Sequence, residues 1–477
     1  MSQNYYLQTF GCQMNVHDSD RMAELLEGHG WSQVEQAEEA DLIVLNTCSV
    51  REKAEHKLRS ELGKLAPLKK KNPDLVLAVT GCVAQQEGER LLSRTPFLDL
   101  VLGPDNLVEL PKLVMDQRGG SPPMARTVFD HDASHFLAAK PRGNGKVPTS
   151  VYVTTMKGCD ERCSFCIVPY TRGSERYRPA DDIVAEIRTW VSAGAREVTL
   201  LGQTVDSFQD PSLPPATPGN PDESQFPHLL RRIAAEVPDL LRLRYTSPHP
   251  RHLTPSLIAV HAELPMLSPH VHMPVQSGSD RILKRMIRRY TRAEYIQRVK
   301  ALQAARPGLT LSTDMIVGFP GETEEDFLQT LSLVAEVGFV SLFGFSYSPR
   351  PYTPALKLPD DVPREVKAER LARLFALAEA QGKAHLQALV GKQVRVLVEG
   401  PSKSGANRLQ GRTERHEIVH LPEHPQFDLV GQELTLTVDE AFNHSLLASL
   451  PASFGDLEKA LPAKLSLSKE PRRLAVL

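Results

Sequence analysis

The sequence predicts an α/β protein with an N-terminal parallel-sheet α/β domain, a central partial (βα)6 barrel and a C-terminal small antiparallel β-barrel. Two features carry this prediction. Apolar, β-branched runs alternate with amphipathic helical stretches at the front of the chain and again from Val151, which is typical of parallel strands covered by helices. After Gly391 apolar and polar residues alternate one by one between turn residues, which is typical of a small antiparallel barrel.

The first block contains predicted pairs of one strand and one helix. The strands are expected at residues 5–9, 42–45 and 75–79, and the helices at 18–28, 50–65 and 84–93. Parallel neighbours need a long crossover connection, which these helices supply. We therefore expect the strands of this block to share one parallel sheet.

The second block repeats the alternation. Its strands are expected at residues 151–155, 197–201, 241–246, 271–275, 309–317 and 340–347. Six parallel strands separated by helices suggest an open, partial βα barrel. The stretch 209–225, rich in Pro and Gly, is expected to be a rim loop, and a long charged helix over about 363–389 closes the block.

The third block holds the alternating runs VRVLVEG, EIVHL and ELTLTVDEAF. From these patterns we predict the domains as residues 1–120, 146–378 and 379–447, with a linker at 121–145 and a tail at 448–477. The linker is inferred from GGSPP and PRGNGKVP, and the tail from its lack of a periodic apolar face.

Length, charge and hydropathy exclude several classes of protein. A chain of 477 residues is too long for one compact core. With 56 basic and 58 acidic residues it is no bulk polycation, and 41% hydrophobic residues argue against disorder. No apolar run approaches the roughly 20 residues of a membrane helix, and the start MSQNYYLQTFGC lacks a signal-peptide pattern. We expect a cytoplasmic protein without a membrane partner.

Three of the six cysteines stand together in MKGCDERCSFC, just after the first predicted barrel strand. In a reducing cytosol cysteines are ligands, nucleophiles or buried apolar residues rather than disulfides. Cys159, Cys163 and Cys166 can fill three corners of a [4Fe–4S] cluster and leave the fourth iron open. The amino and carboxylate groups of S-adenosylmethionine (SAM) can chelate that iron. The alternative is a structural zinc site with a fourth ligand from elsewhere.

The other three cysteines are Cys12, Cys48 and Cys82, and each lies just past the end of a predicted strand. The carboxyl ends of parallel strands share one edge of a sheet, so these residues can meet in space. Gly11 and Gly81 precede two of them and allow close backbone approach. We expect a second cluster here. The alternative is that each cysteine is a small buried apolar residue.

The spacing of Cys159, Cys163 and Cys166, with an aromatic at Phe165, resembles the radical-SAM signature, in which the residue at the Phe165 position lies against the adenine. The whole chain from about Tyr5 to Phe442 resembles the methylthiotransferase family. Within that family it is most similar to the tRNA enzymes that make 2-methylthio-N6-isopentenyl(dimethylallyl)adenosine next to the anticodon. The motifs that carry the resemblance are FGCQMNVHDSDRM, NTCSVREKAE, TGCVAQ, GCDERCSFCIVPYTRGSERYRP, LLGQTVDSF, MPVQSGSDRILKRM and DMIVGFPGETEEDF.

The resemblance implies an N-terminal methylthiotransferase domain, a radical-SAM core and an OB-like C-terminal TRAM domain that binds RNA. It assigns Cys12, Cys48 and Cys82 to an auxiliary [4Fe–4S] cluster and the barrel cysteines to the SAM-cleaving one. One SAM then methylates a cluster-associated sulfur, and a second yields the radical that removes hydrogen from adenine carbon 2. No ordinary side-chain base can remove that hydrogen as a proton, so cofactors must carry the step. No catalytic side chain is assigned outside the clusters.

The implied partners are the anticodon stem-loop of tRNA and a reducing electron donor, with the enzyme as a monomer. The remaining candidates for SAM contact follow predicted barrel strands, where a barrel binds its ligand, or else cap their loops. They are Gln203, Gln276, Ser277, Gly278 and Ser279. The segment GFPGETEEDF is either a helix start or part of the ligand site.

Local clusters of arginine are the candidates for RNA contact, because phosphates bind basic side chains. One cluster runs from Arg281 to Arg292, another follows the barrel cysteines, and a third lies in GRTERHEIVH. The candidates are Arg172, Arg176, Arg285, Arg288, Arg289, Arg412 and Arg415. The alternative is that such runs are solvated surfaces.

Two other functions remain open at this point. Within the enzyme class, a sibling methylthiotransferase would act on threonylcarbamoyladenosine in tRNA or on a ribosomal-protein aspartate. In another class, the chain would be a non-catalytic RNA-binding protein stabilised by iron–sulfur or zinc.

Overall fold

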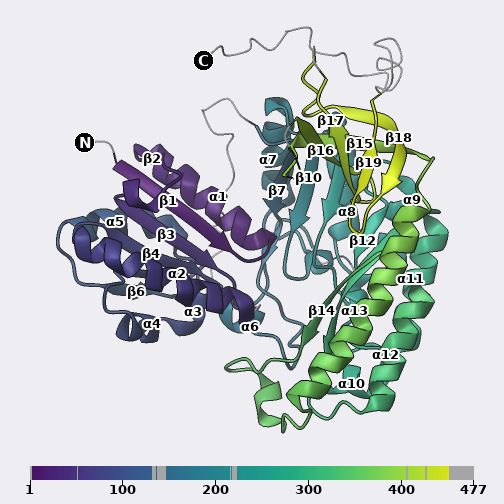
Figure 1. Cartoon of the computed structure of the whole chain (residues 1–477), viewed down its shortest axis with the longest axis horizontal. Helices are drawn as coiled ribbons and strands as arrows, with labels where there is room; N and C mark the ends of the chain where they lie inside the picture. Colours follow the sequence, from purple (N-terminus) through teal and green to yellow (C-terminus); the bar gives the residue numbers. More distant parts are fainter. Residues whose placement is uncertain are drawn as a thin grey trace.

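The computed structural model describes residues 3–50, 52–130, 136, 147–214, 216, 223–403, 405, 407–424 and 427–450. Within these residues the chain forms an N-terminal sheet domain, a central βα unit and a small C-terminal barrel, which lie side by side (Figure 1). No helix in the described ranges is both long enough and apolar enough to cross a bilayer.

The N-terminal domain is a six-stranded sheet whose strands all run parallel, in the order β2-β1-β3-β4-β5-β6. Its strands are β1 (Gln3–Phe10), β2 (Trp31–Gln33), β3 (Leu42–Thr47), β4 (Val76–Gly81), β5 (Leu100–Leu102) and β6 (Met124–Arg126). Its helices are α1 (Gln13–Gly28), α2 (Glu52–Lys71), α3 (Cys82–Glu87), α4 (Glu89–Arg94) and α5 (Leu110–Arg118). The predicted parallel sheet is confirmed, although the sequence pattern had not indicated β2, β5, β6 or α5.

Helices cover both faces of this sheet, which is why its central strands are apolar without interruption. In β3, Leu42 and Val44 join the core with residues of α1 and α5. Ile43 and Leu45 point to the other face and pack with residues of α2, α3 and α4. Successive side chains of a strand point to opposite faces, so a sheet buried twice needs apolar residues at every position.

The central unit contains the six predicted parallel strands, in two three-stranded groups ordered β11-β10-β7 and β12-β13-β14. A parallel bridge between Leu243 and Leu267 links the groups into one open, curved sheet. The strands are β7 (Ser150–Thr154), β10 (Glu197–Leu201), β11 (Arg242–Tyr245), β12 (His270–His272), β13 (Thr310–Val317) and β14 (Ser341–Ser346). This arrangement confirms the predicted partial barrel.

Helices line the outside of the central unit, and a short hairpin of β8 (Met156–Lys157) and β9 (Arg176–Tyr177) flanks the loop after β7. The helices are α6 (Val168–Thr171), α7 (Ala180–Ala193), α8 (Phe226–Glu236), α9 (Pro255–Glu263), α10 (Asp280–Arg285), α11 (Arg292–Ala305) and α12 (Glu324–Val337). The long helix α13 (Arg364–Gln387) matches the predicted charged helix and runs along the unit towards the C-terminal barrel (Figure 1).

The C-terminal domain is a closed barrel in the order β15-β16-β17-β19-β18. Its strands are β15 (Gln393–Pro401), β16 (Arg408–Thr413), β17 (Ile418–Pro422), β18 (Glu433–Ala441) and β19 (Leu446–Ala448). The prediction of a small barrel is confirmed, and four of its five pairings are antiparallel. The exception is β17 with β19, which run parallel, so the barrel is mixed.

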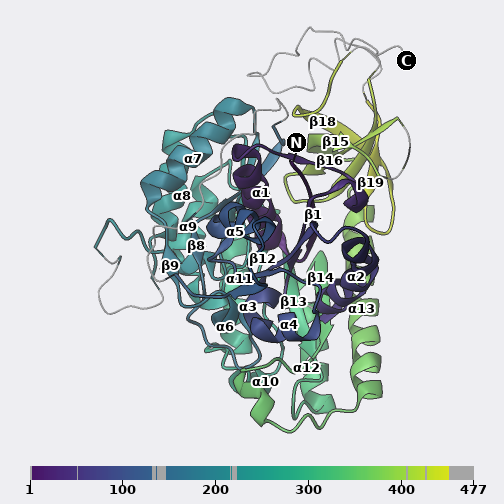
Figure 2. The same ribbon diagram turned by 90° about the vertical axis from the view of Figure 1, so that its left-hand side faces the viewer.

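Two arginines of β11 dock this barrel on the central unit. Arg242 donates to Glu433 at 2.6 Å and to the carbonyls of Arg412 and Arg395, and Arg244 donates to the carbonyl of Thr413. Both arginines are buried. The turned view in Figure 2 shows the N-terminal domain in front of the central unit, with the small barrel above them.

The predicted domain limits stay predictions. Strand β6 lies within the proposed linker at 121–145, and helix α13 continues across the proposed boundary at 378/379. The rest of the linker is largely outside the described residues, as are parts of the rim loop 209–225. Of the proposed tail, residues 451–477 lie outside the described part of the chain, and its first residue, Ala448, belongs to β19.

Candidate cluster and cofactor site

The register of the N-terminal sheet gathers Cys12, Cys48 and Cys82 at one edge. Phe10 pairs with Thr47, and Thr47 pairs with Gly81, so three neighbouring strands end level with one another. Cys48 and Cys82 are the next residues of their strands, and the Cys48 amide donates to the Phe10 carbonyl at 2.8 Å. The structure thus brings these three cysteines, the front trio, together as the sequence predicted.

Two of these cysteines also begin helices. Cys12 is the N-cap of α1 and Cys82 is the first residue of α3. The partial positive charge of a helix N-terminus favours a thiolate. The Cys48 thiol next to it lowers the pKa of Cys12 to about 6, whereas burial raises the pKa of Cys82.

Gly81 has a φ of 89° and a ψ of −159°, a conformation that glycine adopts far more readily than other residues. A Cβ atom added there would lie 2.3 Å from Asn46 Oδ1 and 2.8 Å from the carbonyl oxygen of Thr47. The absence of a side chain at Gly81 therefore lets β4 close on β3 just before Cys82.

We expect Gly81→Ala to destabilise the N-terminal domain by about 1–3 kcal/mol, the usual cost of an L-residue held in such a conformation. Gly63→Ala is the matched control, since Gly63 lies in α2 with no atom within 4 Å of its added Cβ. A helical glycine replaced by alanine gains roughly 0.5–1 kcal/mol, so the control should be stabilised. Thermal unfolding of both variants checks the pair, and equal melting temperatures would contradict it.

The second set, the barrel trio of Cys159, Cys163 and Cys166, lies in the loop between β8 and α6. The Cys159 thiol lies 3.0 Å from Thr204 Oγ1, and the amide of Cys166 donates to the Cys163 carbonyl at 3.1 Å. Burial and, next to it, the neighbouring Cys163 together raise the pKa of Cys166 to about 12. Thiols whose burial disfavours the thiolate need a nearby positive charge to ionise, which bound iron would supply.

In each trio, a buried arginine donates a hydrogen bond to one of the cysteine sulfurs. Arg172, 3% exposed, donates through Nε to Cys82 Sγ at 3.3 Å, and Arg288, 5% exposed, donates through Nη1 to Cys163 Sγ at 3.4 Å. Both were expected among the RNA contacts. Their burial is at odds with a direct contact to phosphate, because a buried guanidinium is held by local acceptors. Sequence runs of arginine do not reveal which members face inward.

The residues expected to contact SAM have hydrogen bonds of their own within the protein. Gln203 Oε1 accepts from the Gly158 amide at 2.5 Å, directly before Cys159. Ser279 caps α10 and donates to Asp326 at 2.6 Å, and the Gly278 amide donates to Thr330 Oγ1 at 2.9 Å. These contacts favour the loop-capping alternative for Gln203, Gly278 and Ser279 without testing a contact to SAM. They also fix the shape of the site's rim.

Ser277 and Gln276 lie in the same loop. Ser277 is buried, with Oγ 3.4 Å from Thr330 Oγ1, and Gln276 has a positive φ of 77° and bridges to Met315 on β13. Phe165, half-buried, packs on the core cluster that contains Phe319 and Tyr347. Its ring thus lies near the carboxyl ends of β13 and β14, which Phe319 and Tyr347 follow. The GFPGETEEDF segment forms the capping box that starts α12.

The other expected RNA contacts differ in exposure. Arg289 is exposed, whereas Arg285 donates to the Pro320 carbonyl at 3.0 Å and Arg176 pairs with Asp105 at 2.7 Å. Arg412 pairs with Glu399 at 3.1 Å, and Arg415 with Glu417 at 3.4 Å.

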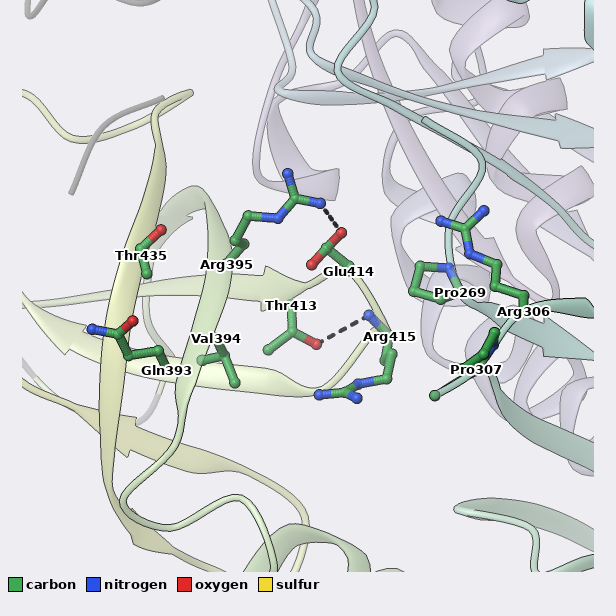
Figure 3. A pocket seen from close by; sticks show the side chains of 11 residues that line it. Pro269, Arg306, Pro307, Gln393, Val394, Arg395, Thr413, Glu414, Arg415 and Thr435 are labelled. Atoms are coloured by element: carbon green, nitrogen blue, oxygen red, sulfur yellow. Dashed lines mark hydrogen bonds and ion pairs between the residues drawn. The ribbon is translucent and has the colours of Figure 1, made fainter. Parts of the chain in front are cut away.

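A cavity of about 320 Å³ separates the C-terminal barrel from the central unit (Figure 3). Arg306, Arg395 and Arg415 line it, and Glu414 binds Arg395 (Figure 3). Its cations therefore have acidic and carbonyl partners already, which makes it an interface pocket rather than an open phosphate site.

The donor sets suit iron–sulfur clusters. No three Cys, His, Asp or Glu side chains in the described ranges gather closely enough to bind one metal ion. A cubane takes one thiolate on each of three separate irons, so its thiolates need not meet at one point. The trios supply three thiols each, and Arg172 Nη1 is buried without a hydrogen-bond partner among the described residues.

Sequence reasoning missed a set of buried polar residues, one of which, Glu161, lies between Cys159 and Cys163 in the barrel trio's loop. His252 bonds Glu161 at 2.9 Å, and the His249 amide donates to Asp206 at 2.8 Å. Burial raises the pKa of Asp206 to about 7. Asp206 follows Gln203 in LLGQTVDSF, yet nothing in that run distinguishes a buried carboxyl from an exposed one.

Two protein-family models match the segments of the chain that contain the two cysteine trios. The model of the Uncharacterized protein family UPF0004 matches residues 4–103, and that of the Radical SAM superfamily matches residues 153–334. A tRNA-2-methylthio-N(6)-dimethylallyladenosine synthase of Sorangium cellulosum (strain So ce56) is 60% identical, over 97% of this chain and 98% of its own. The chain belongs to this synthase family.

A more distant member, from Bordetella petrii (strain ATCC BAA-461 / DSM 12804 / CCUG 43448), is 46% identical over 93% of this chain and 90% of its own. Among solved structures, the radical S-adenosylmethionine methyltransferase TsrM from Kitasatospora setae matches with a TM-score of 0.51 at 15% identity, over 84% of this chain and 79% of that one. That likeness concerns the fold alone. The synthase family thus spans the sheet domain, the central unit and the small barrel together.

Proposed function

We propose that this chain is a radical-SAM tRNA methylthiotransferase that inserts a methylthio group at carbon 2 of N6-isopentenyl(dimethylallyl)adenosine next to the anticodon. Membership of the synthase family supports the reaction. The structural observation that carries it is that two adjacent residues contact a cysteine of each trio: Arg172 donates to Cys82 Sγ, and the Gly173 carbonyl accepts from the Cys159 amide. Adenine carbon 2 must lie within reach of both cofactors, so the two trios must be near each other.

The front trio would hold the auxiliary [4Fe–4S] cluster, and the barrel trio the cluster that binds SAM. When bound, these cofactors supply the electron that cleaves SAM and the sulfur that enters the adenine. The protein's own residues hold and orient the cysteines. Thr204 and the Gly173 carbonyl fix the thiol and the amide of Cys159, while Arg288 fixes Cys163.

The protein also shields the site. Cys48, Cys82 and Cys163 are buried, and the apolar side chains around Phe165 close the site on the side of α10. Excluding water and stray hydrogen donors protects a reactive intermediate. The remaining candidates for SAM contact, Gln203 and Gln276 with Ser277 to Ser279, would shape the rim of this space.

For the RNA, we propose that the exposed Arg289 meets a phosphate near the site. It follows Arg288 directly, and its charge acts on Glu161 within the barrel trio's loop. On the C-terminal barrel, which we interpret as the TRAM domain, Arg412 and Arg415 would have to exchange their pairs with Glu399 and Glu417 for a phosphate. Phosphate contacts of this kind position a nucleic acid without reading its sequence.

Mass analysis of tRNA nucleosides tests the function. Cells that lack this protein should lose 2-methylthio-N6-isopentenyladenosine and accumulate N6-isopentenyladenosine. The native gene should restore the product, whereas a Cys159→Ala gene should not. An unchanged level of the methylthio nucleoside would overturn the assignment, and a change confined to threonylcarbamoyladenosine derivatives would move it to the sibling enzymes.

A further inference from the structure

Arg172 occupies the contact between the N-terminal domain and the central unit. It belongs to the C-terminal end of α6, yet its guanidinium reaches two side chains of the other domain. Nε donates to Cys82 Sγ at 3.3 Å and Nη2 to Asp18 Oδ2 at 2.6 Å. Although burial alone would raise the pKa of Asp18, the charge of Arg172 brings it down to about 2. The pair is therefore ionised inside the protein.

The hydrogen bonding of the third guanidinium nitrogen of Arg172 is incomplete among the described residues. Nη1 is buried and has no hydrogen-bond partner among the described residues. A buried donor without an acceptor is unfavourable, so native proteins seldom leave one unless another group fills the place. The Nε hydrogen bond to Cys82 Sγ places the guanidinium beside the front trio.

The backbone around Arg172 is tied to the barrel trio. The carbonyl of Gly173 accepts from the Cys159 amide at 3.1 Å. The carbonyl of Arg172 accepts from Arg176, which in turn pairs with Asp105 of the N-terminal domain at 2.7 Å. One segment of the chain thus fixes a cysteine of each trio.

We propose that Arg172 is a positioning residue that holds the auxiliary cluster against the barrel trio and donates from Nη1 to a sulfur of that cluster. This inference rests on the proposed function. Hydrogen bonds to cluster sulfurs and a nearby positive charge stabilise the added negative charge of the reduced form, so they raise the reduction potential. Asp18 orients the guanidinium and offsets part of its charge.

The test uses the full-length chain with Cys159, Cys163 and Cys166 replaced by Ala, so that only the front trio can hold iron. The reduction midpoint is measured by a redox titration followed by electron paramagnetic resonance. Arg172→Gln should shift it to a more negative potential and weaken iron retention, because the charge and one donor are lost beside an ionised Asp18. Arg172→Lys, which keeps the charge, should recover part of the shift.

A matched control separates an effect on the reduction midpoint from an effect on folding. Arg178 is equally buried and pairs with Glu186 at 2.7 Å, but it contacts neither trio in the described structure. Arg178→Gln should lower stability without moving the midpoint. Should Arg172→Gln fail to fold, Asp18→Asn serves instead, and it should shift the midpoint to a more positive potential because a negative charge is removed.

The outcomes are distinguishable. If the triple-alanine chain with native Arg172 binds no iron, the proposed auxiliary cluster fails. If it binds iron and Arg172→Gln leaves the midpoint and the iron retention unchanged, the cluster stands and the role of Arg172 is overturned. A shift shared equally by Arg178→Gln would also overturn it.

Discussion

Cys159→Ala is expected to abolish SAM cleavage, whereas Cys48→Ala should leave cleavage intact and block insertion of sulfur. Cys159 belongs to the barrel trio, and its thiol and amide are both held in place. Loss of one of three thiolates removes a corner of the cluster. Cys48 belongs to the front trio on the other domain, so its loss spares the barrel trio.

The measurement is the yield of 5′-deoxyadenosine under reducing conditions, together with the methylthio nucleoside formed on tRNA. Cys159→Ala should give neither product, and Cys48→Ala should give only the first. Thr204→Val is the control, because it removes a contact to Cys159 Sγ but keeps all six thiols, and it should reduce both products only partly. Equal loss of cleavage in both cysteine variants would disprove this division of labour.

Arg242→Met should loosen the C-terminal barrel from the central unit. Arg242 is buried and donates to Glu433, which is itself 2% exposed. Removing one partner of a buried ion pair costs up to about 3–5 kcal/mol, and among the described residues Glu433 would keep only its longer contact with Arg395 at 3.6 Å. The Arg412 and Arg395 carbonyls lose a donor as well.

Hydrogen exchange of the β16 and β18 amides measures the loss, and the affinity for tRNA should fall with it. Arg231→Ala is the matched control, since its pair with Glu263 is exposed and such pairs contribute at most about 1 kcal/mol. Adding Glu433→Gln to Arg242→Met should restore part of the protection, because the buried charge that lost its 2.6 Å partner is then gone. Unchanged exchange in Arg242→Met would contradict the docking role of this pair.

Much of the architecture could be predicted from short-range patterns. The apolar runs at 42–45 and 75–79 became β3 and β4 because a strand buried on both faces must be apolar throughout. Strands β5 and β6 have only three residues each, too few for a period to be visible. The parallel pairing of β17 with β19 joins segments that are distant in the chain, so no local pattern indicates it.

The sequence by itself predicted two cysteine trios, the front one with support from the family resemblance. The spacing of Cys159, Cys163 and Cys166 is local, and the front trio follows strand ends that any parallel sheet brings to one edge. Only the tertiary structure decided which arginines contact these cysteines. Arg172 and Arg289 look alike in the sequence, but packing of one domain on another buries the first against Cys82 and leaves the second exposed. Burial is a property of long-range contacts, and those contacts turn a common basic residue into a partner of a thiolate.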